Sequence, residues 1–157
     1  MRPVKTEVLL SQSPAELWKR LARPEFCLTL SHALRACRGG ASVKLHGAGS
    51  PPAFAAGARV AVLDARGGRE SFSWDIRTCE PPYRLELAVR KEKGFFDAGE
   101  FICSLELLEA PAKGTRVQAE VFAVMFRAPL ELLSLLVPVR WLYARAVRKA
   151  VKQASRS

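Results

Sequence analysis

The side chains that could carry acid–base chemistry are few and far apart in this sequence. His32 and His46 are the only histidines, and a histidine near a pocket entrance can act as a general base. Neither stands at a spacing from serine or aspartate that indicates a catalytic pair, so we interpret both as surface residues. Asp64 shares the parity of apolar neighbours in a predicted strand and could point inward, where burial would raise its pKa. We expect it instead in a turn at the end of that strand.

The cysteines do not have the spacing of a metal site. Cys27, Cys37, Cys79 and Cys103 form no C-x-x-C pair, and the two histidines do not complete a zinc-binding pattern. The G-x-S-x-G, H-E-x-x-H and glycine-rich phosphate-binding motifs are also missing from the sequence. We therefore predict neither a metal nor a cofactor, and we interpret the cysteines as buried, reduced thiols of a cytoplasmic protein.

Length and charge set further bounds. The 157 residues predict a single domain, residues 1–157, with a sizeable core. The net charge of +10 allows attraction to an anionic partner, although it also suits a small domain that needs charge for solubility. Met1–Glu7 leads directly into a strand-like run, so we expect no signal peptide. Apolar runs such as Leu135–Val139 are much shorter than the ~20 residues that a membrane span needs.

The elements that must position these residues are mostly strands, because apolar and polar residues alternate with period two. The clearest case is Arg69–Cys79, in which Phe72 and Trp74 share one face. Short turns such as Gly67-Gly68 join consecutive strands and make the sheet antiparallel. Strands are predicted over Val4–Leu10, Ser42–His46, Ala58–Ala65, Arg69–Cys79, Tyr83–Lys91, Phe101–Glu109 and Thr115–Arg127, with a loop at Gly47–Gly57 and a turn region at Lys93–Gly99.

Two short helices should follow the first strand. Ser13, Pro14 and Glu16 form the pattern of a capping box with proline at the first helical position. This pattern predicts a helix that ends near Arg23. A second short helix is predicted from Pro24 to Leu30.

The longest helical pattern covers Pro129–Ser157. Its apolar stripe has the spacing of an amphipathic helix and consists of Leu132, Leu136, Val139, Tyr143, Ala146, Val147, Ala150 and Ala154. A long helix after a run of strands is expected to cover the inner face of the sheet. Pro138 falls inside the stripe, so we expect a kink or a break there, with Pro129–Val137 as a shorter segment.

Three local patterns resemble the helix-grip, START-like superfamily of polyketide cyclases/dehydrases and lipid-transfer proteins. They are Ser13-Pro14-Ala15-Glu16-Leu17-Trp18, Glu80-Pro81-Pro82-Tyr83-Arg84-Leu85 and Lys113-Gly114-Thr115-Arg116-Val117. The resemblance implies an α+β, helix-grip fold: a curved antiparallel sheet of about seven strands wrapped around a long C-terminal helix, with two short helices after the first strand. It also implies a cavity between sheet and helix for an apolar ligand.

We predict a ligand pocket where the apolar strand faces meet the stripe of the C-terminal helix. Small side chains such as Ala119 and Ala150 leave room there, and Trp74 offers flat aromatic surface to a ligand. Ordinary core packing explains the aromatic residues equally well. The residues predicted to line the pocket are Phe72, Trp74, Leu87, Cys103, Val121, Met125 and Tyr143.

The outer face of the C-terminal helix is basic and has no acidic residue after Arg140. Its cations include Arg145, Arg148, Lys149 and Lys152. The helix dipole favours cations near a C-terminus, which accounts for them without a partner. With Trp141 among them, they could instead contact an anionic membrane surface. No aromatic motif for base stacking is present, so nucleic acid is not expected as a partner.

Three classes of function remain open. The apolar strand faces and the missing catalytic motifs favour a binding module that holds a hydrophobic small molecule or lipid without chemistry of its own. The alternative is an enzyme similar to a polyketide cyclase, aromatase or dehydratase, in which pocket shape orients the substrate and polar groups move protons. That enzyme needs at least two converging polar groups, for which Asp64, Thr78 and Tyr143 are the candidates. Peripheral membrane contact through the basic helix is the third class.

Overall fold

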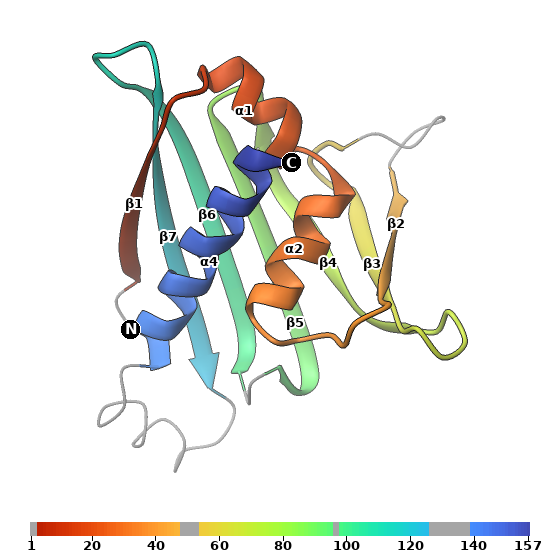
Figure 1. Ribbon diagram of the computed structural model, residues 1–157. Coiled ribbons are helices and arrows are strands. Elements are labelled where there is room, and N and C mark those ends of the chain that lie inside the picture. Colours follow the sequence, from red (N-terminus) through yellow and green to blue (C-terminus); the bar gives the residue numbers. More distant parts are fainter. Residues whose placement is uncertain (1–2, 48–53, 96–97, 126–138) are drawn as a thin grey trace.

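The computed structural model describes residues 3–47, 54–95, 98–125 and 139–157, and among these the side chains of all but 90–95, 98–99, 124–125 and 139–140. The strands are β1 (Val4–Leu10), β2 (Ser42–His46), β3 (Arg59–Leu63), β4 (Glu70–Glu80), β5 (Arg84–Phe95), β6 (Ala98–Glu109) and β7 (Thr115–Met125), and the helices are α1 (Pro14–Leu21), α2 (Pro24–Ala33) and α4 (Val139–Arg156). All three of these helices lie on the same face of a curved sheet (Figure 1).

The strands of the described part form one sheet in the order β1-β7-β6-β5-β4-β3-β2, and every neighbouring pair is antiparallel. Strands β2 to β7 follow one another across the sheet, and β1 then pairs with β7. Strands β1 and β2 therefore occupy opposite edges. The predicted fold class is confirmed, because the sheet, the two short helices after β1 and the C-terminal helix are all present.

The start of α1 is fixed by the predicted capping box. The Ser13 hydroxyl accepts a hydrogen bond from the Glu16 N–H at 3.4 Å, and the Glu16 carboxylate accepts one from the Ser13 N–H at 3.4 Å. Pro14 stands in the first turn, where a missing N–H removes no helical hydrogen bond. The buried side chains of Leu17 and Trp18 then hold the helix in the core.

Helix α2 runs three residues further than predicted and ends in a tight turn. Arg35 follows the last turn with a φ of 56°, in the left-handed region. The Ala36 N–H donates to the carbonyl of Ser31 at 2.8 Å, which is the long hydrogen bond of a Schellman motif. This arrangement turns the chain away toward β2.

The predicted turn region at Lys93–Gly99 is wrong, because β5 continues to Phe95 and β6 begins at Ala98. Phe95 and Ala98 pair across the two strands after a register shift that begins at Arg90. The side-chain alternation stops near Lys91, whereas the backbone hydrogen-bond ladder does not depend on side-chain polarity and continues. Reading the strand from its apolar pattern therefore ended it too early.

Helix α4 lies across the sheet beside β1 and β7, and its C-terminal end meets α1 (Figure 1). The amide of Gln12 and the guanidinium of Arg20 both donate hydrogen bonds to the Ser155 carbonyl at that end. The helix is described from Val139 onward. The predicted break at Pro138, the segment Pro129–Val137 and most of the loop at Gly47–Gly57 lie outside the described residues.

Candidate ligand-binding site

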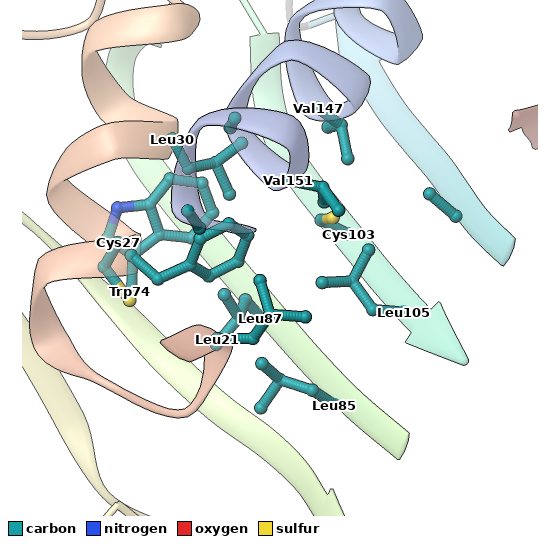
Figure 2. Close-up of a cluster of buried hydrophobic side chains, with 14 of the residues drawn as sticks. Leu21, Cys27, Leu30, Trp74, Leu85, Leu87, Cys103, Leu105, Val147 and Val151 are labelled. Atoms are coloured by element: carbon teal, nitrogen blue, oxygen red, sulfur yellow. The ribbon is translucent and has the colours of Figure 1, made fainter. Parts of the chain in front are cut away.

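Most of the residues predicted to line a pocket lie on the inner face of the sheet. Leu87, Cys103 and Val121 are direct partners across β5, β6 and β7, and each is at most 1% exposed. The neighbouring row pairs Phe101 of β6 with Ala123 of β7. All five residues belong to one buried apolar cluster, in which Leu87 and Cys103 lie beneath α2 and α4 (Figure 2). The side chain of Met125 lies outside the described part.

An aromatic row connects the sheet to α4. Phe72 and Trp74 of β4 have ring centroids 6.5 Å apart, and Trp74 lies 5.9 Å from Phe101 of β6. Phe101 in turn lies 5.7 Å from Tyr143 of α4. All three contacts are edge-to-face, with interplanar angles of 67°, 82° and 89°, which is the arrangement that the ring quadrupoles favour. The row places four rings at the boundary between sheet and helix.

The position of Trp74 is fixed by polar contacts that the sequence interpretation missed. Its Nε1–H donates to the Ser31 hydroxyl at 2.9 Å, and that hydroxyl donates to the Cys27 carbonyl at 2.7 Å. Ser31 is fully buried on the same face of α2 as Phe26 and Leu30. In the sequence, the position of Ser31 at helical spacing from Phe26 and Leu30 was the signal that could have predicted its burial.

Two of the four cysteines lie inside the apolar cluster. Burial raises the pKa of the Cys103 thiol to about 12, and burial also raises the pKa of the Cys27 thiol far above its usual range. Both groups therefore stay protonated at neutral pH and act as small apolar side chains. Cys37 and Cys79 are only partly buried, so the prediction that all four thiols are buried is wrong for these two, which lie near the chain surface.

The polar candidates for catalysis do not come together. Asp64 is exposed in the turn after β3, where its carboxylate accepts a hydrogen bond from the Arg66 N–H at 3.1 Å. Thr78 is half-buried in β4, and Tyr143 is the only one of the three in the aromatic row. His32 and His46 are exposed, and the Nδ1 atom of His32 lies 3.4 Å from the Cys37 sulfur.

A hollow of about 600 Å³ lies away from the apolar cluster, between the turn after α2 and the β3–β4 turn. Arg35, Arg38 and Arg66 line it together with Cys37 and Asp64. None of the predicted pocket residues contributes to it. Its charged, open lining differs from the apolar surroundings that a hydrophobic ligand needs.

The basic residues predicted on the outer face of α4, namely Arg145, Arg148, Lys149 and Lys152, are all exposed. No helix in the described ranges combines the length and the hydropathy that crossing a membrane requires. In the same ranges, no three His, Cys, Asp or Glu side chains gather in a way that would hold a metal ion.

Known proteins resemble this chain in structure, whereas no protein-family model and no curated protein matches its sequence. The structure of Ara h 8.0201 superposes with a TM-score of 0.59 at 15% identity, covering 96% of this chain and 97% of that chain. Norcoclaurine synthase from Thalictrum flavum superposes with a TM-score of 0.57 at 11% identity, covering 96% and 92%. A protein from Nitrosospira multiformis gives a TM-score of 0.57 at 14% identity, covering 99% of both chains.

Identities this low establish the architecture and not the activity. The chain has the helix-grip fold that these structures share, which agrees with the START-like resemblance of its three local patterns. Within that fold, the inner sheet face and α4 form the candidate site, because they bring the predicted apolar and aromatic residues together.

Proposed function

We propose that this protein is one helix-grip domain that binds a hydrophobic small molecule or lipid between its sheet and α4. The observation that carries the proposal is the edge-to-face row that joins Phe72, Trp74 and Phe101 to Tyr143 across that boundary. A ligand with flat apolar groups would extend the same contacts at the Phe101–Tyr143 end. The shared fold supports this, since norcoclaurine synthase has been solved in complex with dopamine and hydroxybenzaldehyde, both small aromatic molecules.

The described side chains favour a protein that binds its ligand without catalysing a reaction. The buried polar side chains of the described part are Ser31, Thr115 and Ser155, none of which ionises near neutral pH. A cyclase or dehydratase would need proton-transfer groups converging on the substrate. The candidates for such groups were Asp64, Thr78 and Tyr143. Asp64 lies in an exposed turn after β3, which is separated in the sheet by β4 and β5 from the β6 strand that carries Phe101. The binding role needs no proton transfer from any of them.

The proposal can be tested with a neutral hydrophobic fluorophore, because an anionic dye would also bind the basic surface. Titration with 1-aminoanthracene is expected to give saturable fluorescence enhancement. Ala123, the buried partner of Phe101, is changed to Phe to fill the site, and binding should be lost. Ala112→Phe, at an exposed position in the β6–β7 turn, is the matched control and should bind normally.

Two further measurements test whether the variant is folded and whether the natural protein carries a ligand. Circular dichroism should show that Ala123→Phe is folded, and the milder Ala123→Leu serves if it is not. Native mass spectrometry with lipid extraction, on protein purified from its own cell, should reveal a bound apolar molecule. Unsaturable fluorescence together with no extracted molecule would overturn the proposal.

A further inference from the structure

One side of α4 combines exposed cations with exposed apolar side chains. Trp141 is 68% exposed and Leu142 is 54% exposed at the N-terminal end of the helix. The exposed cations are Arg145, Arg148, Lys149, Lys152 and Arg156. At 100° per residue, all seven positions fall within an arc of about 120°, and we call this arc the basic face. Buried residues such as Val147 and Ala150 occupy the opposite side, so α4 packs on the sheet with one side only.

The charge of the basic face is not balanced nearby. None of its five cations forms an ion pair with a carboxylate among the described residues. On the adjacent β1–β7 edge, Glu120 is already paired with Lys5 at 2.7 Å and Glu7 with Arg116 at 4.0 Å. The helix dipole acts within about the last turn, and Arg145 lies well before it. Packing and helix stability therefore leave most of this charge unexplained.

The shape of the basic face favours an extended partner over a single small anion. A shallow hollow of about 650 Å³ follows its cations from Arg145 to Arg156. A smaller hollow of about 180 Å³ lies between α4 and β1, and its lining includes Trp141, Arg148 and Lys5. From Arg145 to Arg156 the helix rises about 16 Å at 1.5 Å per residue. A row of cations of that length matches an array of negative groups.

We propose that the basic face docks this protein on an anionic lipid bilayer, with Trp141 and Leu142 entering the interfacial layer. Cations attract acidic headgroups, and an indole ring prefers the boundary between headgroups and acyl chains. Leu142 gains from burial in lipid and has no comparable partner on a phosphate backbone. This role is independent of a ligand bound between the sheet and α4.

Vesicle binding gives the first test. Vesicles of phosphatidylcholine with about 30% phosphatidylserine should sediment the protein, whereas vesicles of phosphatidylcholine alone should not. Each cation near such a surface strengthens binding roughly five-fold, so Arg145→Gln/Arg148→Gln/Lys152→Gln should weaken it about 100-fold. The control Lys44→Gln/Arg66→Gln/Arg69→Gln removes the same charge from exposed positions in β2 and the β3–β4 turn, far from the β1 edge. It should bind nearly as the unmodified protein does.

Trp141 provides a second readout, because Trp18 is 9% exposed and Trp74 is fully buried. Tryptophan emission should shift to shorter wavelength on anionic vesicles, and Trp141→Phe should abolish that shift. Equal binding to neutral vesicles, equal weakening in the control variant, or no Trp141 shift would each overturn the proposal. Tighter binding to a short DNA duplex than to anionic vesicles would assign the basic face to nucleic acid instead. Neither result depends on whether 1-aminoanthracene binds.

Discussion

The indole Nε1 of Trp74 lies 2.9 Å from the hydroxyl oxygen of Ser31, and both side chains are fully buried. This hydrogen bond ties the middle of β4 to α2 beside the buried apolar cluster that contains Trp74 (Figure 2). It also sets the plane of the indole against which Phe101 packs edge-on at 5.9 Å. The helix before the sheet therefore helps to position the aromatic row that reaches α4.

Removing the Ser31 hydroxyl should destabilise the protein. Ser31→Ala takes away the acceptor of a buried N–H, which costs about 1–3 kcal/mol in the free energy of unfolding. Thr29→Ala is the matched control, because its hydroxyl also bonds a carbonyl four residues earlier but is exposed, and its cost should stay within about 0.5 kcal/mol. Urea denaturation measures both. Equal losses would show that the Trp74 contact contributes little.

The buried thiols should make stability depend on alkaline pH. The pKa of Cys103 is about 12 in the folded protein, and the pKa of Cys27 is also raised. In the unfolded chain a thiol ionises near pH 8.5, so above that pH the unfolded state loses protons that the folded state keeps. The free energy of unfolding should therefore be unaffected below about pH 8.5 and fall above it, by about 1.4 kcal/mol per pH unit for each thiol, until the folded-state pKa is reached.

This pH dependence is measured by urea denaturation at a series of pH values. Cys27→Ala/Cys103→Ala should be less stable at neutral pH because it leaves a cavity, yet its stability should decline less steeply above about pH 8.5. An unchanged slope would mean that other groups cause the alkaline loss. The partly exposed thiols of Cys37 and Cys79 should react first with a thiol reagent, since the buried pair must await opening of the core.

The fold was predictable because its signals are local. Period-two alternation identified the strands, and the Ser13–Glu16 capping box identified the start of α1. Strand ends were less predictable where pairing continues beyond the alternation, as in β5 near Phe95. The end of β5 is set by its hydrogen bonds to β6, and the residues of β5 alone do not show how far this pairing extends.

The candidate site was predictable only in part. Alternation placed Leu87, Cys103 and Val121 on the inner face, and the register shows them as neighbours. The partners that fix these residues come from distant segments, as with Ser31 and Trp74, which are 43 residues apart. Such pairs depend on how helices pack on the sheet, and spacing within one element does not encode that.

Gly114 marks a close approach between two segments and should not tolerate a side chain. A Cβ atom at this position would lie 2.3 Å from the carbonyl oxygen of Leu10, a backbone atom that cannot rotate away. Gly114→Ala should lower the free energy of unfolding by about 1–3 kcal/mol. Gly67→Ala, in the β3–β4 turn with nothing within 4 Å of the added atom, is the control and should be close to neutral. Thermal denaturation of the two variants compares them, and similar melting temperatures would contradict the clash.

The C-terminal end of α4 should depend on α1. Arg20 and Gln12 both donate to the Ser155 carbonyl, which is one of the last helical carbonyls that lack an intrahelical partner. Arg20→Met keeps the apolar stem and removes the charged donor, so it should cost about 1.5–3 kcal/mol. Lys19→Met, at the adjacent exposed position, should have little effect. Hydrogen exchange at the α4 C-terminus should be faster in Arg20→Met alone, and equal protection in both variants would exclude this role for Arg20.

Tyr143 distinguishes binding from catalysis at the candidate site, because its ring and its hydroxyl can be removed separately. Tyr143→Phe keeps the ring that meets Phe101 edge-on at 5.7 Å and removes only the hydroxyl. Tyr143→Leu removes the ring as well, with a loss of about 0.5–1.5 kcal/mol in aromatic contact. If the site holds an apolar ligand by contact alone, Tyr143→Phe should bind 1-aminoanthracene as the unmodified protein does, and Tyr143→Leu should bind it several-fold more weakly. Loss of binding in Tyr143→Phe would instead place the hydroxyl against the ligand, where it could donate a proton, and would favour the cyclase-like alternative.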